Sequence, residues 1–375
     1  MSAPTAESPA SKEGLSFAPL RFADLPAWGR ADHRPALFAF RRSAPAIVGS
    51  AVPPSPSGLS PSDFAVAARA ALDDAGEPTA HEARAFFEHF FRPAAILEGG
   101  TPAPGFVTGY YEPELPASRT PTARFRVPLY GRPDDLVSVE EGESVEGLEG
   151  GARFAMAGPA GRPVAYPDRA AIEAGHLAGR GLEIAYLESP VDAFFVHVQG
   201  SARLRLPDGE TMRVGYAAKN GHRFTAIGRV LVQGGELPLE GADMDGIRRW
   251  LAAHPDRTQA LLPQNRSFIF FREVAVEPGA GPIGGAGVPL TPLGSLAVDA
   301  SLHAYGMPVF VDAPSLVIAG APFGRLLIAQ DTGSAILGSA RGDIFVGSGE
   351  EAGRIAGAIR HEARFLALLP KDVRR

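Results

Sequence analysis

Glycine and proline limit the fold of this chain more than any other residues. Among its 375 residues, 44 are glycine and 35 are proline. Proline removes a backbone donor and glycine weakens regular elements, so both residues favour frequent turns. This composition predicts an α+β chain, mainly β with flanking helices, rather than a helical bundle.

Length, charge and composition exclude several classes of protein. A chain of 375 residues forms two domains or one large one. Its net charge of −6 and its lack of a basic run argue against nucleic acid as a partner. With no cysteine, the chain cannot form disulfides, zinc–thiolate sites, iron–sulfur clusters or a cysteine nucleophile.

The sequence gives no signal for a membrane segment. No apolar run approaches the roughly 20 residues that a membrane helix needs. Residues 1–14 are small, polar and rich in proline, which predicts a disordered tail without a signal-peptide core or a lipid-anchor cysteine.

Capping signals predict three helices. Ser60 and Asp63 have capping-box spacing with Pro61 between them, and that helix should end near Asp74. A helix over residues 79–91 should pack a phenylalanine-rich face against the core. A third helix, GADMDGIRRWLAAHP, should be N-capped by Asp243.

The remaining elements are predicted mostly as strands. Residues 191–217 alternate around Asp208 and Gly209, which predicts a hairpin with a type I′ turn. Short strands joined by proline and glycine turns over residues 289–331 predict a small closed β-barrel. A last helix, with a capping box at Ser348 and Glu351, should reach about Phe365.

Two aspartates stand out in the segment AQDTGSAILGSARGDIFVGSG, residues 329–349. Asp331 and Asp343 lie twelve residues apart among glycines and serines, and short apolar runs flank each one. General acid catalysis needs a carboxyl group held on rigid backbone in a partly apolar cleft, with small neighbours that admit a bulky substrate. The segment is therefore the leading candidate for a catalytic site.

Two known signatures occur in this part of the chain, one inside the segment and one before it. Residues 331–334 read DTGS, the tetrapeptide of aspartic proteases, but those enzymes need two such turns and this chain has one. Gly279, Gly281 and Gly284 match a dinucleotide fingerprint, yet the following residues cannot start the required helix, so a mobile loop is expected. The nine histidines show no metal spacing; His197 in a strand pattern and His222 in a turn are interpreted as structural or surface residues.

Residues 108–113, TGYYEP, form a second unusual cluster. Adjacent tyrosines on a strand point to opposite faces, so one ring should face a cleft. Aromatic rings beside hydroxyl and carboxylate groups suit a carbohydrate. The alternative is one core tyrosine and one exposed tyrosine, and the spacing alone favours this alternative.

Six motifs occur in the order found in one known family, and they extend from about Phe106 to Pro370. They are FVTGYYEPEL, FRVPLYGRPDDLV, VGYAAKNGHRFTAIGRVLV, QNRSFIFFREV, GVPLTPLGSLAVD and AQDTGSAILGSARGDIFVGSG. On these motifs the chain resembles the membrane-bound lytic murein transglycosylase A family, whose members cleave peptidoglycan glycan strands.

The resemblance implies a fold and a set of site residues. It implies a double-psi β-barrel catalytic domain from residues 15–115 and 272–375. Residues 116–271 would form an inserted β domain, the other wall of a glycan groove. Asp343 matches the catalytic acid and Asp331 a supporting aspartate. The matched substrate-binding positions are Thr108, Gly109, Tyr110, Tyr111, Gly333 and Ser334.

The resemblance also implies a reaction that yields 1,6-anhydromuramic acid ends without consuming water. Peptidoglycan is the expected partner, and no metal, other cofactor or nucleic acid is expected.

The chain departs from the family at Ser334, where glycine is common, and at Arg266, where proline is common. The family's lipid-anchor cysteine is missing, which argues against membrane attachment through a lipid. A periplasmic location is expected from the substrate, and a monomer is expected, with peripheral association with the outer membrane or cell-wall enzymes left open. An aspartic-type protease using Asp331 and a non-catalytic glycan-binding barrel remain the alternatives.

Overall fold

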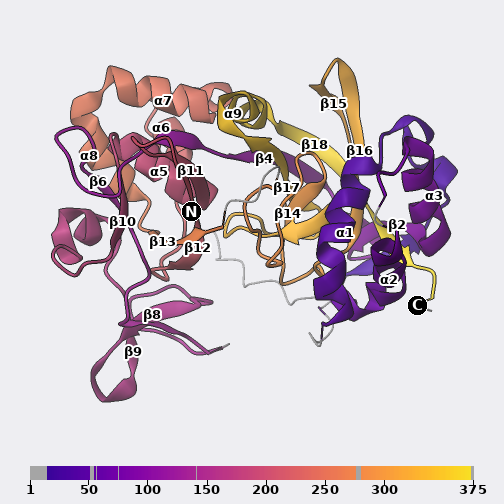
Figure 1. The fold of residues 1–375 in the computed structure, drawn as a ribbon, viewed down its shortest axis with the longest axis horizontal. Helices are drawn as coiled ribbons and strands as arrows, with labels where there is room; N and C mark the ends of the chain where they lie inside the picture. The colour runs from indigo at the N-terminus through magenta and orange to yellow at the C-terminus, as the bar shows by residue number, and fades with distance from the viewer. Residues whose placement is uncertain are drawn as a thin grey trace, which may run out of the picture. The chain divides into compact units, whose positions relative to one another are not determined.

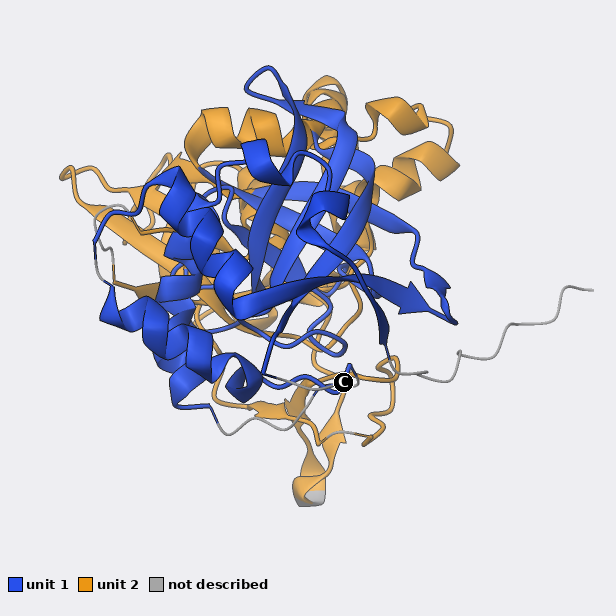
Figure 2. Cartoon of the chain, turned by 90° about the vertical axis from the view of Figure 1, so that its right-hand side faces the viewer, with its two compact units in different colours: residues 1–110, 283–347, 359–375 blue, residues 111–282, 348–358 orange. Residues whose placement is uncertain are grey.

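The computed structural model describes residues 15–50, 55, 57–74, 76–140, 142–275 and 280–372. The chain forms two compact units (Figure 2). Unit 1 comprises residues 1–110, 283–347 and 359–375, and unit 2 comprises residues 111–282 and 348–358. Both ends of the chain therefore contribute to unit 1. The predicted tail, residues 1–14, lies outside the described residues.

Unit 1 is built on one large sheet (Figure 1). Its strands are β1 (Ser16–Pro19), β2 (Phe91–Glu98), β3 (Thr101–Pro102), β4 (Gly105–Glu112), β14 (Ser295–Val298), β15 (Pro308–Ile318), β16 (Ala321–Asp331), β17 (Arg341–Ser348) and β18 (Arg360–Pro370). Within the described residues, six of them close into a ring in the order β18-β15-β16-β14-β17-β4, because β4 also pairs with β18. The predicted closed barrel is therefore confirmed.

The interior of the barrel is apolar. All four residues of β14 are buried, and so are Val309, Phe310 and Val311 of β15. The pair β14–β16 is parallel, whereas the other registered pairs of the ring are antiparallel. Closure of the ring removes the exposed edges that an open sheet would present.

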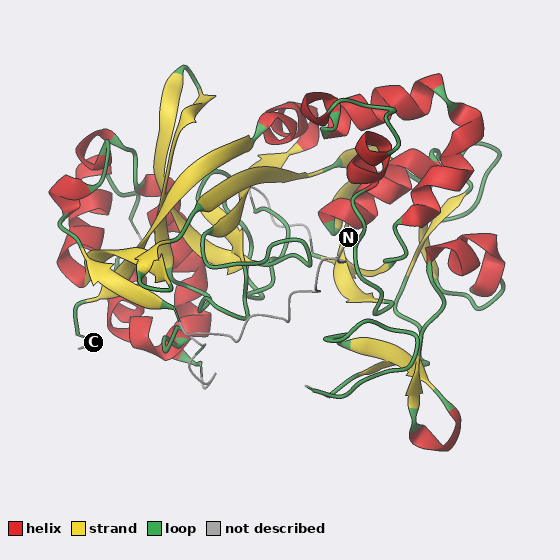
Figure 3. Cartoon of the chain, turned by 180° about the vertical axis from the view of Figure 1, so that it is seen from behind, coloured by secondary structure: helices red, strands yellow, loops and turns green. Residues whose placement is uncertain are grey.

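Three helices flank these strands: α1 (Arg34–Val48), α2 (Ala65–Asp73) and α3 (Ala80–Phe90) (Figure 3). The Ser60–Asp63 capping box and the start of α3 are as predicted, with Thr79 and Glu82 capping each other's backbone. Phe87 is fully buried in an aromatic cluster with Phe40 of α1. Short 3-10 turns also occur in this unit, at η1 (Phe22–Asp24), η2 (Trp28–Arg30) and η3 (Pro61–Phe64).

Unit 2 combines small sheets with helices. A four-stranded sheet has the order β13-β12-β11-β5, and two smaller sheets have the orders β10-β6 and β7-β8-β9. The strands are β5 (Glu114–Pro116), β6 (Val127–Tyr130), β7 (Leu136–Ser138), β8 (Phe154–Ala157), β9 (Pro163–Val164), β10 (Glu183–Leu187), β11 (Ser201–Arg205), β12 (Thr211–Lys219) and β13 (Ile269–Val274). The helices are α4 (Arg169–Ala171), α5 (Pro190–Gln199), α6 (Ile227–Gln233), α7 (Met244–Ala253), α8 (Thr258–Leu261) and α9 (Gly349–Ala358), with short turns η4 (Pro159–Gly161), η5 (Ile172–His176), η6 (Leu239–Gly241), η7 (Pro255–Arg257) and η8 (Leu262–Gln264).

Two of the local predictions are wrong. Residues 190–199 form the helix α5 rather than the first strand of a hairpin, because Ser189 caps the helix and Pro190 occupies its first position. The final helix ends at Ala358, not near Phe365, and residues 360–370 form β18. This strand pairs with β15, β2 and β4, so its tertiary pairing overrides the local helical pattern.

The hairpin turn is also different in type from the prediction. Strands β11 and β12 pair as a hairpin, and Gly209 has a φ of 87°. The Gly209 amide donates to the Leu206 carbonyl, so Pro207 and Asp208 are the central residues of the turn. A type I′ turn needs positive φ at both central residues, which the ring of Pro207 forbids. The predicted Asp243 cap of α7 is confirmed, since its carboxylate accepts from the Gly246 amide at 2.7 Å.

Candidate active site

Asp331 and Asp343 flank the same residue of the barrel. Ala297 of β14 is in register with Asp343 of β17 on one side and with Asp331 of β16 on the other. Neighbouring strands lie about 4.8 Å apart, which places the two aspartate Cα atoms about 10 Å apart. The fold therefore brings together the two acids that the sequence singled out.

Asp343 is part of a three-residue chain of hydrogen bonds. The Thr108 hydroxyl donates to Asp343 Oδ1 at 2.7 Å, and Arg341 Nη2 donates to Thr108 Oγ1 at 2.7 Å. Because a guanidinium can only donate, the hydroxyl oxygen must accept from Arg341 and its hydrogen is left for the carboxylate. Arg341 also donates to the Gly342 carbonyl, which fixes the guanidinium.

The buried environment of Asp343 raises the affinity of its carboxyl for a proton. Burial raises the pKa of the Asp343 carboxyl from 3.8 to about 6, although the Thr108 hydrogen bond and the charge of Arg341 both oppose this rise. The charge of Asp331 adds to it. A carboxyl group with this pKa can both donate and accept a proton at moderate pH, as general acid–base catalysis requires.

Asp331 is held by three donors. The Tyr110 hydroxyl donates to Oδ2 at 2.7 Å, and the backbone amides of Gly285 and Thr332 each donate to Oδ1 at 2.8 Å. Burial raises the pKa of Asp331, and these three hydrogen bonds lower it in part. Burial also raises the pKa of Tyr110 well above its ordinary value, so this phenol stays a donor.

The segment between the two aspartates, residues 332–340, is fixed at its far end. The Gly338 amide donates to Asp299 Oδ2 at 2.9 Å, and His303 Nε2 lies 2.9 Å from the Ser339 carbonyl. Asp299 is itself buried and accepts from the hydroxyl and the amide of Ser301. These contacts give the Asp343 backbone a defined position at the start of β17.

The structure separates the predicted substrate-binding residues into two groups. Thr108 and Tyr110 contact the aspartates, with Gly109 between them on β4. Tyr111 points away: it is buried in unit 2, with its hydroxyl 3.9 Å from the Met244 sulfur. Gly333 and the exposed Ser334 lie on the turn that follows Asp331. The expected alternation of the two tyrosines is thus confirmed.

Two contributors were missed by sequence reasoning. Arg341 lies in the same motif as Asp343, two residues before it, but it received no role. Gly285 contributes only a backbone amide, and its segment was interpreted as a mobile loop. In the structure Gly284 closes a turn with Val288, and the Ala286 amide donates to the Gln330 carbonyl, so this segment folds over Asp331. Gly279, the first position of the supposed dinucleotide fingerprint, lies outside the described residues.

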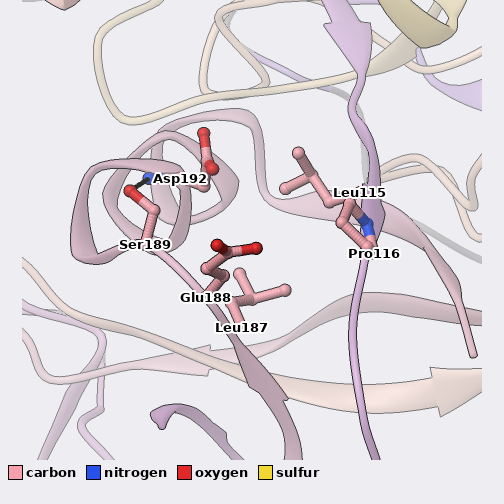
Figure 4. Close-up of a pocket in the computed structure, with 6 residues that line it drawn as sticks. All are labelled: Leu115, Pro116, Leu187, Glu188, Ser189 and Asp192. Carbon is pink, nitrogen blue, oxygen red and sulfur yellow. Dashed lines mark hydrogen bonds between the residues drawn. The ribbon is translucent and has the colours of Figure 1, made fainter. Parts of the chain in front are cut away.

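A separate pocket of about 260 Å³ lies in unit 2 (Figure 4). Its lining residues are Leu115, Pro116, Leu187, Glu188, Ser189 and Asp192. Glu188 pairs with Arg124 at 2.8 Å, and Asp192 pairs with Arg248 at 2.7 Å. Both carboxylates are thus neutralised, and the pocket includes none of the predicted site residues.

Neither metal ligands nor a membrane helix emerge from the described part of the chain. No group of three or more histidine, aspartate or glutamate side chains in it could hold a metal ion. Of the helices described, none has the length and apolar character needed to cross a bilayer. His197 lies in α5 rather than in a strand, and its Nδ1 accepts from the Ile269 amide at 3.1 Å, which is a structural role.

Two family models match the chain. The MltA specific insert domain matches residues 106–272, and the 3D domain matches residues 294–369. The second match contains both aspartates, and the first contains Thr108 and Tyr110.

Known proteins resemble the chain over most of its length. The membrane-bound lytic murein transglycosylase A of Vibrio cholerae is 33% identical over 278 residues, which are 72% of this chain and 67% of that protein. A crystal structure of a membrane-bound lytic murein transglycosylase from Agrobacterium tumefaciens is 44% identical with a TM-score of 0.86, covering 95% of this chain and 98% of that one. A crystal structure of Escherichia coli MltA with bound chitohexaose is 27% identical with a TM-score of 0.66, covering 97% of this chain and 92% of that one.

Proposed function

Because this chain belongs to the membrane-bound lytic murein transglycosylase A family, we propose that it is a peptidoglycan lytic transglycosylase with Asp343 as its catalytic residue. Its substrate would be the β-1,4 bond between N-acetylmuramic acid and N-acetylglucosamine. The observation that carries the proposal is the Asp343 carboxyl, whose pKa is raised to about 6 and which accepts the Thr108 hydroxyl hydrogen bond.

The first step breaks the glycosidic bond. Protonated Asp343 donates its proton to the bridging oxygen as the bond from that oxygen to the muramyl C1 breaks, and the N-acetylglucosamine end leaves as an alcohol. Positive charge develops at C1 and is met by the carbonyl oxygen of the muramyl N-acetyl group. Asp343 is left as a carboxylate that the Thr108 hydroxyl stabilises.

The second step closes the anhydro ring. The muramyl C6 hydroxyl attacks C1 while Asp343 accepts the hydroxyl proton, which returns the carboxyl to its starting state. No water is consumed, and the product is a 1,6-anhydromuramyl end. Glycosidases of the two-carboxylate type place their acids about 5–5.5 Å apart for retention or about 6.5–9.5 Å apart for inversion. Here the nucleophile belongs to the substrate, so one carboxyl is sufficient.

Asp331 has a supporting role in this proposal. Its negative charge raises the pKa of Asp343 and so keeps the acid protonated. Its three donors hold it in place, with Tyr110 on one oxygen and two backbone amides on the other. We assign substrate contacts to Thr108, Gly109, Tyr110, Gly333 and Ser334. Tyr111, whose ring packs against Gly353 of α9, orders the backbone of β4 instead.

The proposal extends to architecture and location. We assign the closed ring of unit 1 to the double-psi class of barrels, and residues 116–271 to an inserted domain. In the structure, α9 at residues 349–358 groups with unit 2, whereas the sequence-based division placed it with the barrel. Since peptidoglycan is the proposed substrate, the working location is the periplasm.

Substitution of the two aspartates tests the assignment. We expect Asp343→Ala to abolish release of anhydromuropeptides from murein sacculi, with an unchanged circular dichroism spectrum. Asp331→Ala should retain a measurable rate, reduced about 10- to 100-fold, because it acts through the pKa of Asp343. An Asp343→Ala protein that cleaves as fast as the parent would remove Asp343 from the mechanism.

The same assay separates the alternatives. An aspartic protease using Asp331 would release peptides and respond to pepstatin-type inhibitors. A glycan-binding barrel without catalytic activity would bind sacculi and release nothing. Asp331 is not part of a matched pair of D-T-G turns, since Asp343 precedes Ile344 and Phe345, and this disfavours the protease.

A further inference from the structure

A bulge in β12 places Tyr216 and Lys219 on one face of the sheet in unit 2. Residues three apart on a regular strand point to opposite faces. The register against β13 shifts between Tyr216 and Ala218, so that Tyr216 pairs with Phe271 and Lys219 pairs with Ile269. Phe271 and Ile269 are two residues apart and share a face, and their partners on β12 therefore share it too.

Two arginines lie near this pair: Arg132, between β6 and β7, and Arg153, directly before β8. The turn after β12 packs closely on the start of β8, since a Cβ atom on Gly221 would lie 2.2 Å from the Phe154 carbonyl oxygen. Arg153 immediately precedes Phe154, and the Arg132 guanidinium lies 5.8 Å from the centroid of the Phe154 ring. The four residues Arg132, Arg153, Tyr216 and Lys219 are called the cationic cluster below.

The positive charges of the cationic cluster are not neutralised by the described residues. Among these residues, the Lys219 ammonium, the Arg153 guanidinium and the Tyr216 hydroxyl have no hydrogen-bond or ion-pair partner, and the Arg132 guanidinium donates only to the Leu136 carbonyl. Lys219 is partly buried; burial first, and then the charge of Arg153, lower its pKa. Burial raises the pKa of Tyr216 to about 12, against the opposing charges of Arg153 and Arg132.

Two arginine charges beside a partly buried lysine cost free energy, although the net charge of the chain is −6. Most of the other arginines of unit 2 have carboxylate partners, for example Arg223 with Glu149 at 2.8 Å and Arg257 with Glu236 at 2.8 Å. An anionic ligand would remove this cost and would fill the unused donors. Two guanidiniums, an ammonium and a phenol together suit a carboxylate.

We propose that the cationic cluster binds a carboxylate carried by the glycan substrate, either on the muramyl lactyl group or on the peptide attached to it. This inference rests on the proposed function, because it takes the ligand from peptidoglycan. It assigns part of the substrate recognition to charged substituents rather than to the sugar rings. The Tyr216 side chain, 43% exposed, would donate its hydroxyl and present its ring beside the cations.

Binding to an inactive protein tests the proposal separately from turnover. In an Asp343→Asn background, the dissociation constants of three probes are measured by calorimetry: a peptide-bearing muramyl tetrasaccharide, the same tetrasaccharide after removal of the peptide by an amidase, and uncharged chitotetraose. We expect Lys219→Met combined with Arg153→Met to weaken binding of the peptide-bearing probe about tenfold and of chitotetraose less than twofold. In the peptide-bearing probe the lactyl carboxyl is joined to the peptide as an amide, whereas the amidase-treated probe carries free lactyl carboxylates. Comparison of these two probes therefore distinguishes the two sources of charge.

The matched control is Arg249→Met, which removes an exposed arginine of α7 without touching the cationic cluster. It should leave all three dissociation constants unchanged. Raising the salt concentration from 0.05 to 0.5 M should weaken only the charged probes. Equal affinities of the double variant and its parent for the charged probes, or an equal loss for chitotetraose, would overturn the proposal. If the native protein, with Asp343 in place, releases no anhydro product, that result would count against the proposed function. The comparison of dissociation constants would still test the cationic cluster.

Discussion

At the scale of single residues, burial and two neighbouring side chains shift the pKa of Asp343 in opposing directions. Burial raises its pKa to about 6, whereas the hydroxyl of Thr108 and the charge of Arg341 favour the carboxylate. The Arg341–Thr108–Asp343 chain thus works against the buried environment. We infer that this balance lets one carboxyl be acid in the first step and base in the second.

Replacement of Thr108 should shift the pH dependence of turnover. The proposed mechanism requires the acid form of Asp343 for bond cleavage, so the rate of the native protein should fall as pH rises through about 6. Thr108→Val removes the donor to the carboxylate, which should raise the pKa of Asp343 and move this fall upward by about one pH unit. Thr108→Ser keeps the hydroxyl and serves as the control. An unchanged pH profile in Thr108→Val, or a flat profile of the native protein between pH 4 and 7, would contradict this account.

The raised pKa also predicts a stability cost. The folded state holds the Asp343 proton more tightly than the unfolded state, so the stability of the native protein should fall as pH rises from about 4 to about 6. One pKa unit corresponds to about 1.4 kcal/mol, which sets an upper bound of about 3 kcal/mol. Asp343→Asn lacks this cost. Its melting temperature should exceed that of the native protein at pH 7.5, and the difference should vanish near pH 3.5; a constant difference would refute the assigned pKa.

At the scale of elements, β4 carries two residues of the candidate site and ends in a buried ion pair. It supplies Thr108 and Tyr110 to the aspartates, and Glu112 at its end is fully buried against Arg213 of β12. Arg213 Nε lies 2.8 Å from Glu112 Oε1, and the Ser348 hydroxyl donates to Oε2 at 2.7 Å. The ion pair therefore fixes the point at which β4 leaves the barrel.

Removal of this buried carboxylate should destabilise the protein strongly. Glu112→Gln leaves the Arg213 charge buried without its partner, which typically costs about 3–5 kcal/mol. Glu114→Gln is the matched control, because its pair with Arg205 reaches solvent and contributes at most about 1 kcal/mol. Thermal unfolding of the two variants compares them directly. Similar melting temperatures for both would show that the buried pair contributes little.

The same scale explains which elements the sequence could predict. Helices with strong local caps, such as those at Thr79 and Asp243, were predicted correctly. The run of Val and Phe in α5 resembles a strand, and only its cap at Ser189 and Pro190 indicates a helix. Strand β18 depends on partners far away in the chain, for example Phe106 opposite Glu362, and no local pattern contains that information.

Some residues of the candidate site could be identified from the sequence, and others could not. Asp343 and Asp331 could be found because their motif is distinctive, and the family resemblance paired them with Thr108, 235 positions from Asp343 in sequence. The Gly285 amide could not be found, because a backbone donor depends on the path of the chain rather than on its side chain. The burial of Tyr111 could not be predicted either, since spacing alone cannot say which of two adjacent tyrosines is buried.

At the scale of the whole molecule, the barrel joins segments from both ends of the chain. Strand β4, early in the sequence, closes the ring by pairing with β18 at the C-terminus. Unit 2 begins directly after Tyr110 and so continues the strand that carries two site residues. This arrangement predicts that folding of the barrel is a condition for assembly of the site, because its residues come from β4, β16 and β17.

Product identity is the most direct test of the central claim, which is that one carboxyl cleaves the glycan without water. Purified sacculi are incubated with the native protein in water enriched in oxygen-18, and the released fragments are analysed by mass spectrometry. The account predicts fragments that end in 1,6-anhydromuramic acid and carry no oxygen-18. Reducing ends labelled with oxygen-18 would show hydrolysis and would contradict it.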